Sequence, residues 1–183
     1  NADFGLNLTY GITSNVTLDG TYNPDFSQVE ADAGQIAVNE RFALFFQEKR
    51  PFFLEGTEIF GLPKQLVFTR TVVDPVAGAK VTGKMGGATL GYLGAVDNID
   101  DSTDVFVNLL RVRQDVGAAS TIGAIYTDRT HANDDFNRVV GIDGRMVLAR
   151  RYTLQLQGAA SWDRSAGTET STGQLFYAQV ARA

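Results

Sequence analysis

Hydrophobic and polar residues alternate with a period of two along most of the chain, which is the pattern of a β-strand with two different faces. The first segment carries apolar side chains at every second position, Leu6, Leu8, Tyr10 and Ile12. A turn signal at 13–15 follows, and the alternation resumes at 16–22, at 35–45 and again after residue 78. The sequence therefore predicts an all-β protein in which consecutive antiparallel strands form an up-and-down meander.

The connections between the later strands alternate in length. We expect strands near 66–70, 78–85, 88–96, 103–115, 120–128, 138–149, 152–163 and 174–182. Tight turns are predicted at 86–87, 117–119 and 150–151, and long polar loops at 97–102, 129–137 and 164–173. Consecutive connections of a meander lie at opposite ends of the sheet, so the tight turns share one end. Outer-membrane β-barrels have this asymmetry, with short periplasmic turns and longer extracellular loops.

Residues 46–65 lose the alternation and contain Pro51 and Pro63, so they are predicted to form an irregular insert. If 35–45 is a strand, this insert lies at the end of the sheet that carries the tight turns. The chain starts at Asn1 and stops at Ala183, in both cases within or beside an alternating segment. We therefore expect residues 1–183 to be a single β-barrel domain or a fragment of a larger barrel.

Three strands are long enough to cross a membrane. The segments 103–115, 138–149 and 152–163 meet the 9–11 residues that a tilted membrane-spanning strand needs. On the first of them Arg111 and Arg113 alternate with apolar neighbours. An arginine that faces lipid at mid-membrane costs about 2–4 kcal/mol, so both arginines are predicted to face the lumen. A soluble β-sandwich has the same alternation and remains an alternative.

Composition excludes several other classes of protein. The chain has 183 residues, a formal net charge of −5, no cysteine and one histidine. These numbers exclude a disulfide scaffold, a cysteine-ligated zinc site and a thiol nucleophile, and they argue against a protein that neutralises nucleic-acid phosphates. No apolar run approaches the roughly 20 residues of a membrane helix. The mean hydropathy of −0.09 is still compatible with barrel strands, because their two faces average out.

Two segments between the early strands carry a family resemblance. They are Asn23–Asp32, NPDFSQVEAD, and Glu48–Gly56, EKRPFFLEG. The chain resembles a family of uncharacterised bacterial surface proteins, described as a domain of unknown function. The family usually has Pro in place of Gln47 and a Ser-Arg pair where this chain has Thr69-Arg70. The resemblance implies an amino-terminal carbohydrate-binding-like domain, similar to binding-module family nine, followed by an outer-membrane barrel, and it supplies no activity.

The same two segments concentrate charged residues of both signs. The predicted structural residues of the insert are Asp25, Glu30, Asp32, Glu48, Lys49, Arg50 and Glu55. Charges that are removed from water need partners of opposite sign, so we expect an ion-pair network that holds the insert folded as a plug against or inside the barrel. A contact with a substrate or partner, and metal binding or catalysis, remain open as alternatives for these residues.

No other segment carries a recognisable chemical site. The acidic loop at 97–104 lacks the spacing of a calcium-binding loop, and His131 lies alone in a polar loop. Neither a nucleophile elbow nor a phosphate-binding loop is present. We therefore expect no catalytic, cofactor-binding or metal-binding residues.

These observations predict a non-enzymatic β-barrel protein of a Gram-negative-type outer membrane. It would act as a channel, a ligand-docking protein or a component of an envelope assembly. Its expected partners are membrane lipid and other protein chains or further copies that complete the sheet, and not nucleic acid. About ten or eleven strands are expected, whereas a bacterial single-chain barrel normally has an even number. Two alternatives stay open: a soluble extracellular β-domain that binds glycan or protein, and a carboxylate-dependent hydrolase.

Overall fold

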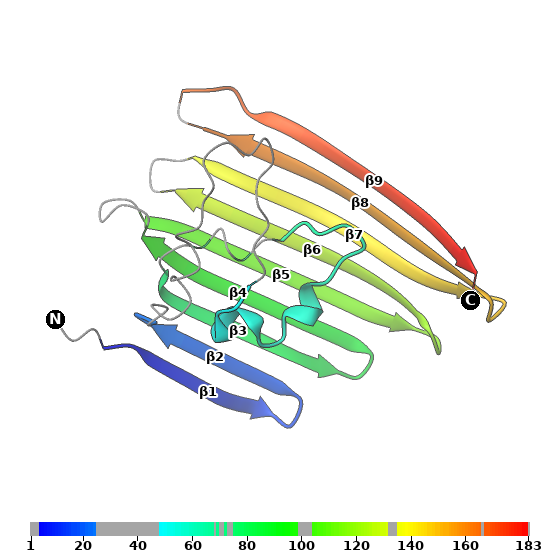
Figure 1. Ribbon diagram of the computed structural model, residues 1–183, viewed down its shortest axis with the longest axis horizontal. Helices are drawn as coiled ribbons and strands as arrows, with labels where there is room; N and C mark the ends of the chain where they lie inside the picture. Colours follow the sequence, from blue (N-terminus) through cyan, green and yellow to red (C-terminus); the bar gives the residue numbers. More distant parts are fainter. Residues whose placement is uncertain are drawn as a thin grey trace.

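A computed structural model describes residues 4–24, 48–67, 69, 72, 75–98, 104–131, 135–165 and 167–182. In these residues nine strands form one antiparallel sheet in sequence order (Figure 1). They are β1 (Leu6–Thr13), β2 (Val16–Tyr22), β3 (Pro75–Met85), β4 (Ala88–Asn98), β5 (Asp104–Val116), β6 (Ser120–His131), β7 (Phe136–Leu148), β8 (Tyr152–Arg164) and β9 (Ser171–Arg182). The predicted all-β up-and-down meander is therefore confirmed.

The sheet is open. β1 and β9 lie at its two opposite edges, and within the described residues no pairing joins them (Figure 1). The strands that the sequence predicts after residue 78 are all present, with ends that differ by a few residues. The strand predicted at 66–70 is wrong, because Leu66, Val67 and Thr69 belong to no strand. The strand predicted at 35–45 lies outside the described residues.

Tight turns and long connections are separated as predicted, but the position of the insert differs. β2 pairs directly with β3, and Tyr22 lies opposite Ala77. The chain therefore leaves β2 and enters β3 at the end of the sheet that carries the long connections. The prediction that residues 46–65 lie at the tight-turn end is wrong. It requires a strand at 66–70, between the insert and β3, and the described residues of that segment form none.

The described part of the insert lies across one face of the sheet (Figure 1). It contains the short helix α2 (Pro51–Leu54), with proline at its start, and the 3-10 helix η1 (Thr57–Phe60). No helix in the described ranges is long and apolar enough to cross a membrane. We call the face under the insert the inner face and the opposite one the outer face. The hydrophobic core lies between insert and inner face and consists of Phe52, Phe53, Phe60, Val72, Leu93, Ala95, Leu109 and Ile125.

The outer face is apolar and exposed. Its side chains come from every second residue of each strand, as the register of pairing requires. Large exposed examples are Leu8, Tyr10, Leu110, Ile142, Trp162, Phe176 and Val180. The described insert packs against the opposite face. The sheet therefore has one face that carries the buried core together with buried charged residues, and one apolar face that none of the described elements covers.

Candidate functional site

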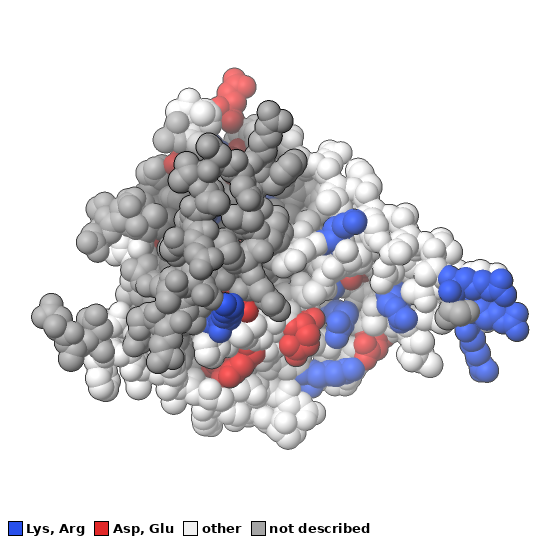
Figure 2. All heavy atoms as spheres, viewed as in Figure 1, with Lys and Arg blue, Asp and Glu red and all other residues white. Residues whose placement is uncertain are grey.

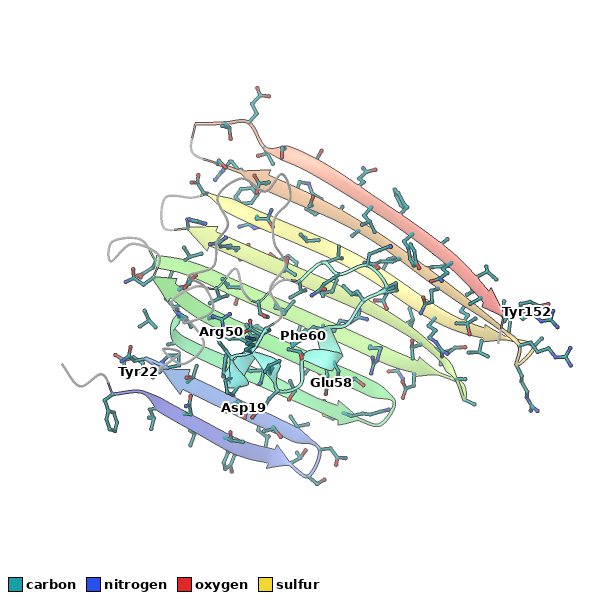
Figure 3. The ribbon with its side chains drawn as sticks, viewed as in Figure 1. Asp19, Tyr22, Arg50, Glu58, Phe60 and Tyr152 are labelled. Carbon is teal, nitrogen blue, oxygen red and sulfur yellow. The ribbon has the colours of Figure 1, made fainter. Side chains whose placement is uncertain are left out.

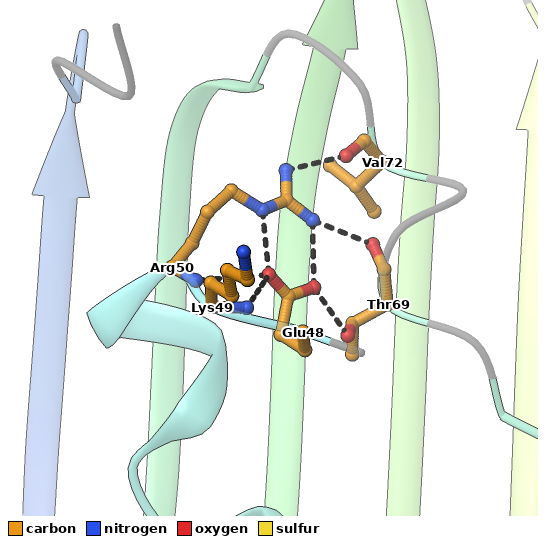
Figure 4. Close-up of polar contacts among 5 residues, drawn as sticks. All are labelled: Glu48, Lys49, Arg50, Thr69 and Val72. Carbon is orange, nitrogen blue, oxygen red and sulfur yellow. Dashed lines mark hydrogen bonds and ion pairs between the residues drawn. The ribbon is translucent and has the colours of Figure 1, made fainter. Parts of the chain in front are cut away.

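A buried ion pair holds the start of the insert. Both carboxylate oxygens of Glu48 accept hydrogen bonds from the Arg50 guanidinium, from Nε at 2.8 Å and from Nη2 at 2.9 Å (Figure 4). The Thr69 hydroxyl donates a further bond of 2.7 Å to Glu48. Arg50 also donates to the carbonyl oxygens of Val72, at 2.6 Å, and Thr69, at 3.0 Å. The pair therefore joins the two ends of the described insert, which are about twenty residues apart.

The surroundings keep Glu48 ionised. Burial of the Glu48 carboxyl raises its pKa, but the hydrogen bonds from Arg50 and Thr69 outweigh this effect and lower the pKa to about 2. The guanidinium of Arg50 in turn lies 4.2 Å from the centre of the Phe53 ring, which is fully buried. The charge of Arg50 is therefore satisfied by one carboxylate, two carbonyls and one aromatic face.

Lys80 fastens the insert to the sheet. Its side chain is 1% exposed and its ammonium donates to the carbonyl oxygens of Phe52 at 2.7 Å and Glu55 at 2.8 Å. The same nitrogen lies 3.7 Å from the carboxylate of Asp19 on β2. Asp19 also accepts a bond of 2.8 Å from the hydroxyl of Thr9 on β1. One buried cation thus links α2 to three neighbouring strands.

Two glycines let the insert approach the strands closely. A methyl group on Gly91 would lie 2.8 Å from the Ile59 side chain and 2.9 Å from the Phe60 ring, and one on Gly78 would lie 2.9 Å from the Phe52 ring. Figure 3 shows Phe60 and Arg50 over the sheet on the side of the insert. Glycine inside a strand is expected where another segment comes close, and here that segment is the insert.

The insert also reaches the far strands. The backbone N–H of Lys64 donates to the side-chain oxygen of Gln157 at 2.6 Å, and the Gln157 amide donates back to the Lys64 carbonyl at 2.9 Å. The ammonium of Lys64 lies 4.8 Å from the centre of the Tyr177 ring on β9. The insert is therefore bound to β3 at one side and to β8 and β9 at the other.

Arg111 lies on the inner face in a second buried ion pair. Its guanidinium donates two bonds to Asp143 on β7, of 2.5 and 2.9 Å, and its side chain is 1% exposed. The side chain crosses β6 above Gly123, where a methyl group would lie 2.6 Å from it. Arg113 also lies on the inner face, whereas Leu110 and Val112 are exposed on the outer face.

The structure brings together part of the predicted insert cluster. Glu48 and Arg50 are bonded to each other, and the backbone N–H of Lys49 donates to Glu48 at 3.1 Å. Glu55 contributes its carbonyl oxygen to Lys80, while its side chain is exposed. The remaining three predicted residues, Asp25, Glu30 and Asp32, lie outside the described residues.

Sequence reasoning missed the partners on the strands. Lys80, Asp143 and Gln157 are polar residues at inner-face positions of otherwise ordinary strands, and all three bind a residue far away in the sequence. One signal in the sequence was Lys80 within the alternating segment 78–85. A lysine on a buried face needs hydrogen-bond or ion-pair partners. Within the described ranges, no group of three or more histidine, cysteine, aspartate or glutamate side chains is placed to hold a metal ion.

Part of the chain is similar to a described protein family. No curated protein and no solved structure matches the chain. The match is to a family described as Domain of unknown function (DUF5916), over residues 1–84. That range covers β1, β2, the insert and all but the last residue of β3. Over its first 84 residues the chain is thus similar to an uncharacterised domain of unknown function, as the motifs around Pro24 and Pro51 predict.

Proposed function

We propose that the protein is a non-enzymatic component of an outer-membrane β-barrel. In this proposal the outer face contacts lipid and the inner face lines a lumen that the insert fills. The insert occupies the inner face from β3 to β9, which favours a docking or envelope-assembly role over an open channel. The observation that carries the proposal is the band of exposed apolar side chains on the outer face, opposite an inner face that holds buried ion pairs.

The dimensions of the outer face support a membrane-spanning wall. On β8 the outer-face residues between Tyr152 and Trp162 are Leu154, Leu156, Gly158 and Ala160. Ten residues at about 3.3 Å each give about 33 Å along the strand, or about 25 Å across a membrane at a tilt of about 40°. This matches the height of the apolar band of a membrane barrel, about 25 Å, with an aromatic residue at each border.

A group of polar residues on the outer face lies where the band ends. Next to Trp162 in the register lies Arg138 on β7, then Asp128 on β6 and Asn108 on β5. Arg138 and Asp128 form an ion pair of 2.8 Å, and Asn108 accepts a bond of 2.9 Å from the Tyr92 hydroxyl. These groups lie towards the long connections, where an outer-membrane barrel has its extracellular headgroup region.

The inner face has the chemistry of a lumen. Figure 2 shows this face, with charged side chains of both signs around the part of the insert that is described. The buried pairs Arg111–Asp143 and Glu48–Arg50 satisfy charges that would cost several kcal/mol if they faced lipid. The opposite assignment, with the inner face towards lipid, is therefore unfavourable.

The two alternative functions fit less well. Soluble monomers rarely expose contiguous apolar patches larger than a few hundred Å², whereas here the apolar residues extend from Leu8 on β1 to Val180 on β9. A carboxyl group that acts as a general acid in hydrolysis must hold a proton near neutral pH. Glu48 has a pKa of about 2, and both of its oxygens are occupied by hydrogen bonds.

Single cysteines on β8 test the proposal. The chain contains no cysteine, so Leu156→Cys on the outer face and Gln155→Cys on the inner face give matched labelling sites. Each variant is folded into phosphatidylcholine vesicles and labelled with an environment-sensitive fluorophore. We expect nitroxide-bearing lipids to quench the label at 156 and not the label at 155. Equal quenching at both positions, or none at either, would refute a lipid-facing outer side.

A further inference from the structure

Three exposed arginines lie together at the tight-turn end of the sheet. Arg150 and Arg151 form the β7–β8 turn, and Arg182 lies opposite Tyr152 in the register of β8 with β9. Figure 2 shows this group of positive side chains at the end of the molecule near the carboxy terminus. Within the described part of the chain none of the three makes an ion pair or a side-chain hydrogen bond. In a chain with a net charge of −5, this is a local excess of positive charge.

An apolar hollow lies beside these arginines on the outer face. It has a volume of about 870 Å³ and is lined by side chains of β5 to β9, among them Ile122, Ile142, Leu156 and Phe176. Gly144 and Gly158 also line it, and their lack of side chains deepens it. The exposed lining is almost entirely apolar, and the polar side chain of Gln114 lies at its β5 side.

The hollow and the arginines are placed for one amphiphilic ligand. Ala178 lines the hollow and precedes Arg182 by four residues on β9. Four residues of a strand span about 13 Å, which corresponds to the distance from a lipid phosphate to the middle of its acyl chain region. Guanidinium groups bind phosphate oxygens through paired hydrogen bonds, and a hollow with mainly apolar lining accepts a hydrocarbon chain.

We propose that this end of the outer face is a binding site for an anionic membrane phospholipid. The phosphate lies among Arg150, Arg151 and Arg182, and an acyl chain lies in the hollow. The inference rests on the proposed function, because it places the tight-turn end at a membrane surface. It adds a preference for a charged headgroup, which a lipid-facing wall alone does not require.

The conformation of the turn agrees with a role for the arginine side chain. Ala149 and Arg150 have φ of 49° and 55°, a region that glycine and asparagine normally occupy in two-residue hairpin turns. In the β3–β4 turn the corresponding positive φ, of 59°, belongs to a glycine, Gly86. The β7–β8 turn keeps an arginine in this unfavourable conformation. The phosphate site gives a reason for keeping it there.

A tryptophan placed between the two parts of the site reports the lipid next to it. Leu154 lies on the outer face between the hollow and Tyr152, so Leu154→Trp is combined with Trp162→Phe. The protein is folded into phosphatidylcholine vesicles that contain a small fraction of brominated phosphatidylglycerol, or the same fraction of brominated phosphatidylcholine. We expect phosphatidylglycerol to quench several-fold more strongly, since each arginine near anionic lipid contributes roughly a fivefold preference.

Charge variants separate the headgroup contribution. Replacing Arg150, Arg151 and Arg182 together by glutamine should make the two brominated lipids equally effective. Replacing all three by lysine keeps the charge and should retain most of the preference at low salt. A preference that survives the glutamine variant would overturn the assignment of the phosphate to these residues.

A second pair of variants tests the hollow. Gly158→Leu fills it, because Gly158 lines the hollow and an added Cβ there meets only ordinary contacts of about 3.9 Å. Gly20→Leu adds the same volume on the outer face of β2, where nothing lies within 4 Å and no part of the hollow is formed. We expect the first variant to reduce the preference for phosphatidylglycerol and the second to leave it unchanged.

The outcomes distinguish this inference from the proposed function. If the introduced tryptophan is quenched by neither lipid, the outer face does not contact a membrane and both proposals fail. If both lipids quench equally in the otherwise unmodified chain, the protein faces lipid and only the phospholipid site fails. If Gly158→Leu leaves the preference for phosphatidylglycerol intact, the arginines attract the headgroup alone, and the role of the hollow is overturned.

Discussion

Glu48→Gln is expected to loosen the insert from the sheet. The substitution keeps the size of the side chain but removes the negative charge that faces Arg50 at 2.8 Å. The Arg50 side chain is only 9% exposed, so its charge then loses its counter-ion while it remains buried. Breaking one partner of a buried ion pair is strongly destabilising, because the remaining charge is neither hydrated nor paired.

The size of the effect follows from the pKa of Glu48. The carboxyl is lowered from 4.5 to about 2, which at about 1.36 kcal/mol per pKa unit corresponds to about 3 kcal/mol of stability. Since the folded-state pKa lies below the unfolded-state pKa, this contribution is complete above about pH 4.5. It is lost as the pH falls from 4.5 through 2, and below about pH 2 Glu48 is protonated in both states.

Urea unfolding of the wild-type chain and of the variant, measured in detergent micelles at several pH values, checks this prediction. Other carboxyl groups titrate in both proteins, so the difference in unfolding free energy isolates Glu48. We expect a difference of about 3 kcal/mol at pH 6 that shrinks steadily below pH 4.5. A small difference that does not change with pH would refute the assignment of Glu48 as the ion that holds the insert.

Three further substitutions test other contacts, each by its change in unfolding free energy under the same conditions. Gly91→Ala places a methyl group against the insert and should destabilise by about 1–3 kcal/mol, while Gly20→Ala on the open outer face should change little, and equal effects would contradict the close approach. Asp143→Asn leaves the buried Arg111 without its counter-ion and should cost about 3 kcal/mol, and an unchanged unfolding free energy would contradict a buried ion pair. Ala149→Gly relieves a positive φ and should stabilise by up to about 1 kcal/mol, whereas a destabilisation would mean that the turn is not strained.

The alternation of the sequence was sufficient to predict the sheet and the two faces of its strands. The positions of Arg111 and Leu110 illustrate why this works. Neighbouring residues of a strand point to opposite faces, so a charged residue and an apolar neighbour define both faces at once. The seven later strands follow from this rule alone, and their ends differ because turn residues are weak markers of a strand terminus.

The end of the sheet at which the insert lies was not predictable in the same way. Leu66 and Val67 are apolar because they pack against the core under the insert, and a run of apolar residues has the same appearance in a strand. The strand residues that bind the insert were not predictable either. Lys80 and Gln157 bind segments that are 28 and 93 residues away, and a single sequence carries no sign of such distant pairings.

The depth of two tryptophans in a membrane tests the central claim most directly. Trp162 is the only tryptophan of the chain and lies at one border of the apolar row on β8, while Leu156 lies near its middle. The wild-type chain is compared with a Leu156→Trp, Trp162→Phe variant in vesicles whose lipids carry bromine at different depths. We predict that bromines near the headgroups quench Trp162 most strongly and that bromines near the membrane centre quench the tryptophan introduced at position 156 most strongly. If both tryptophans instead remain accessible to iodide in water and show no dependence on bromine depth, the outer face does not lie in a membrane.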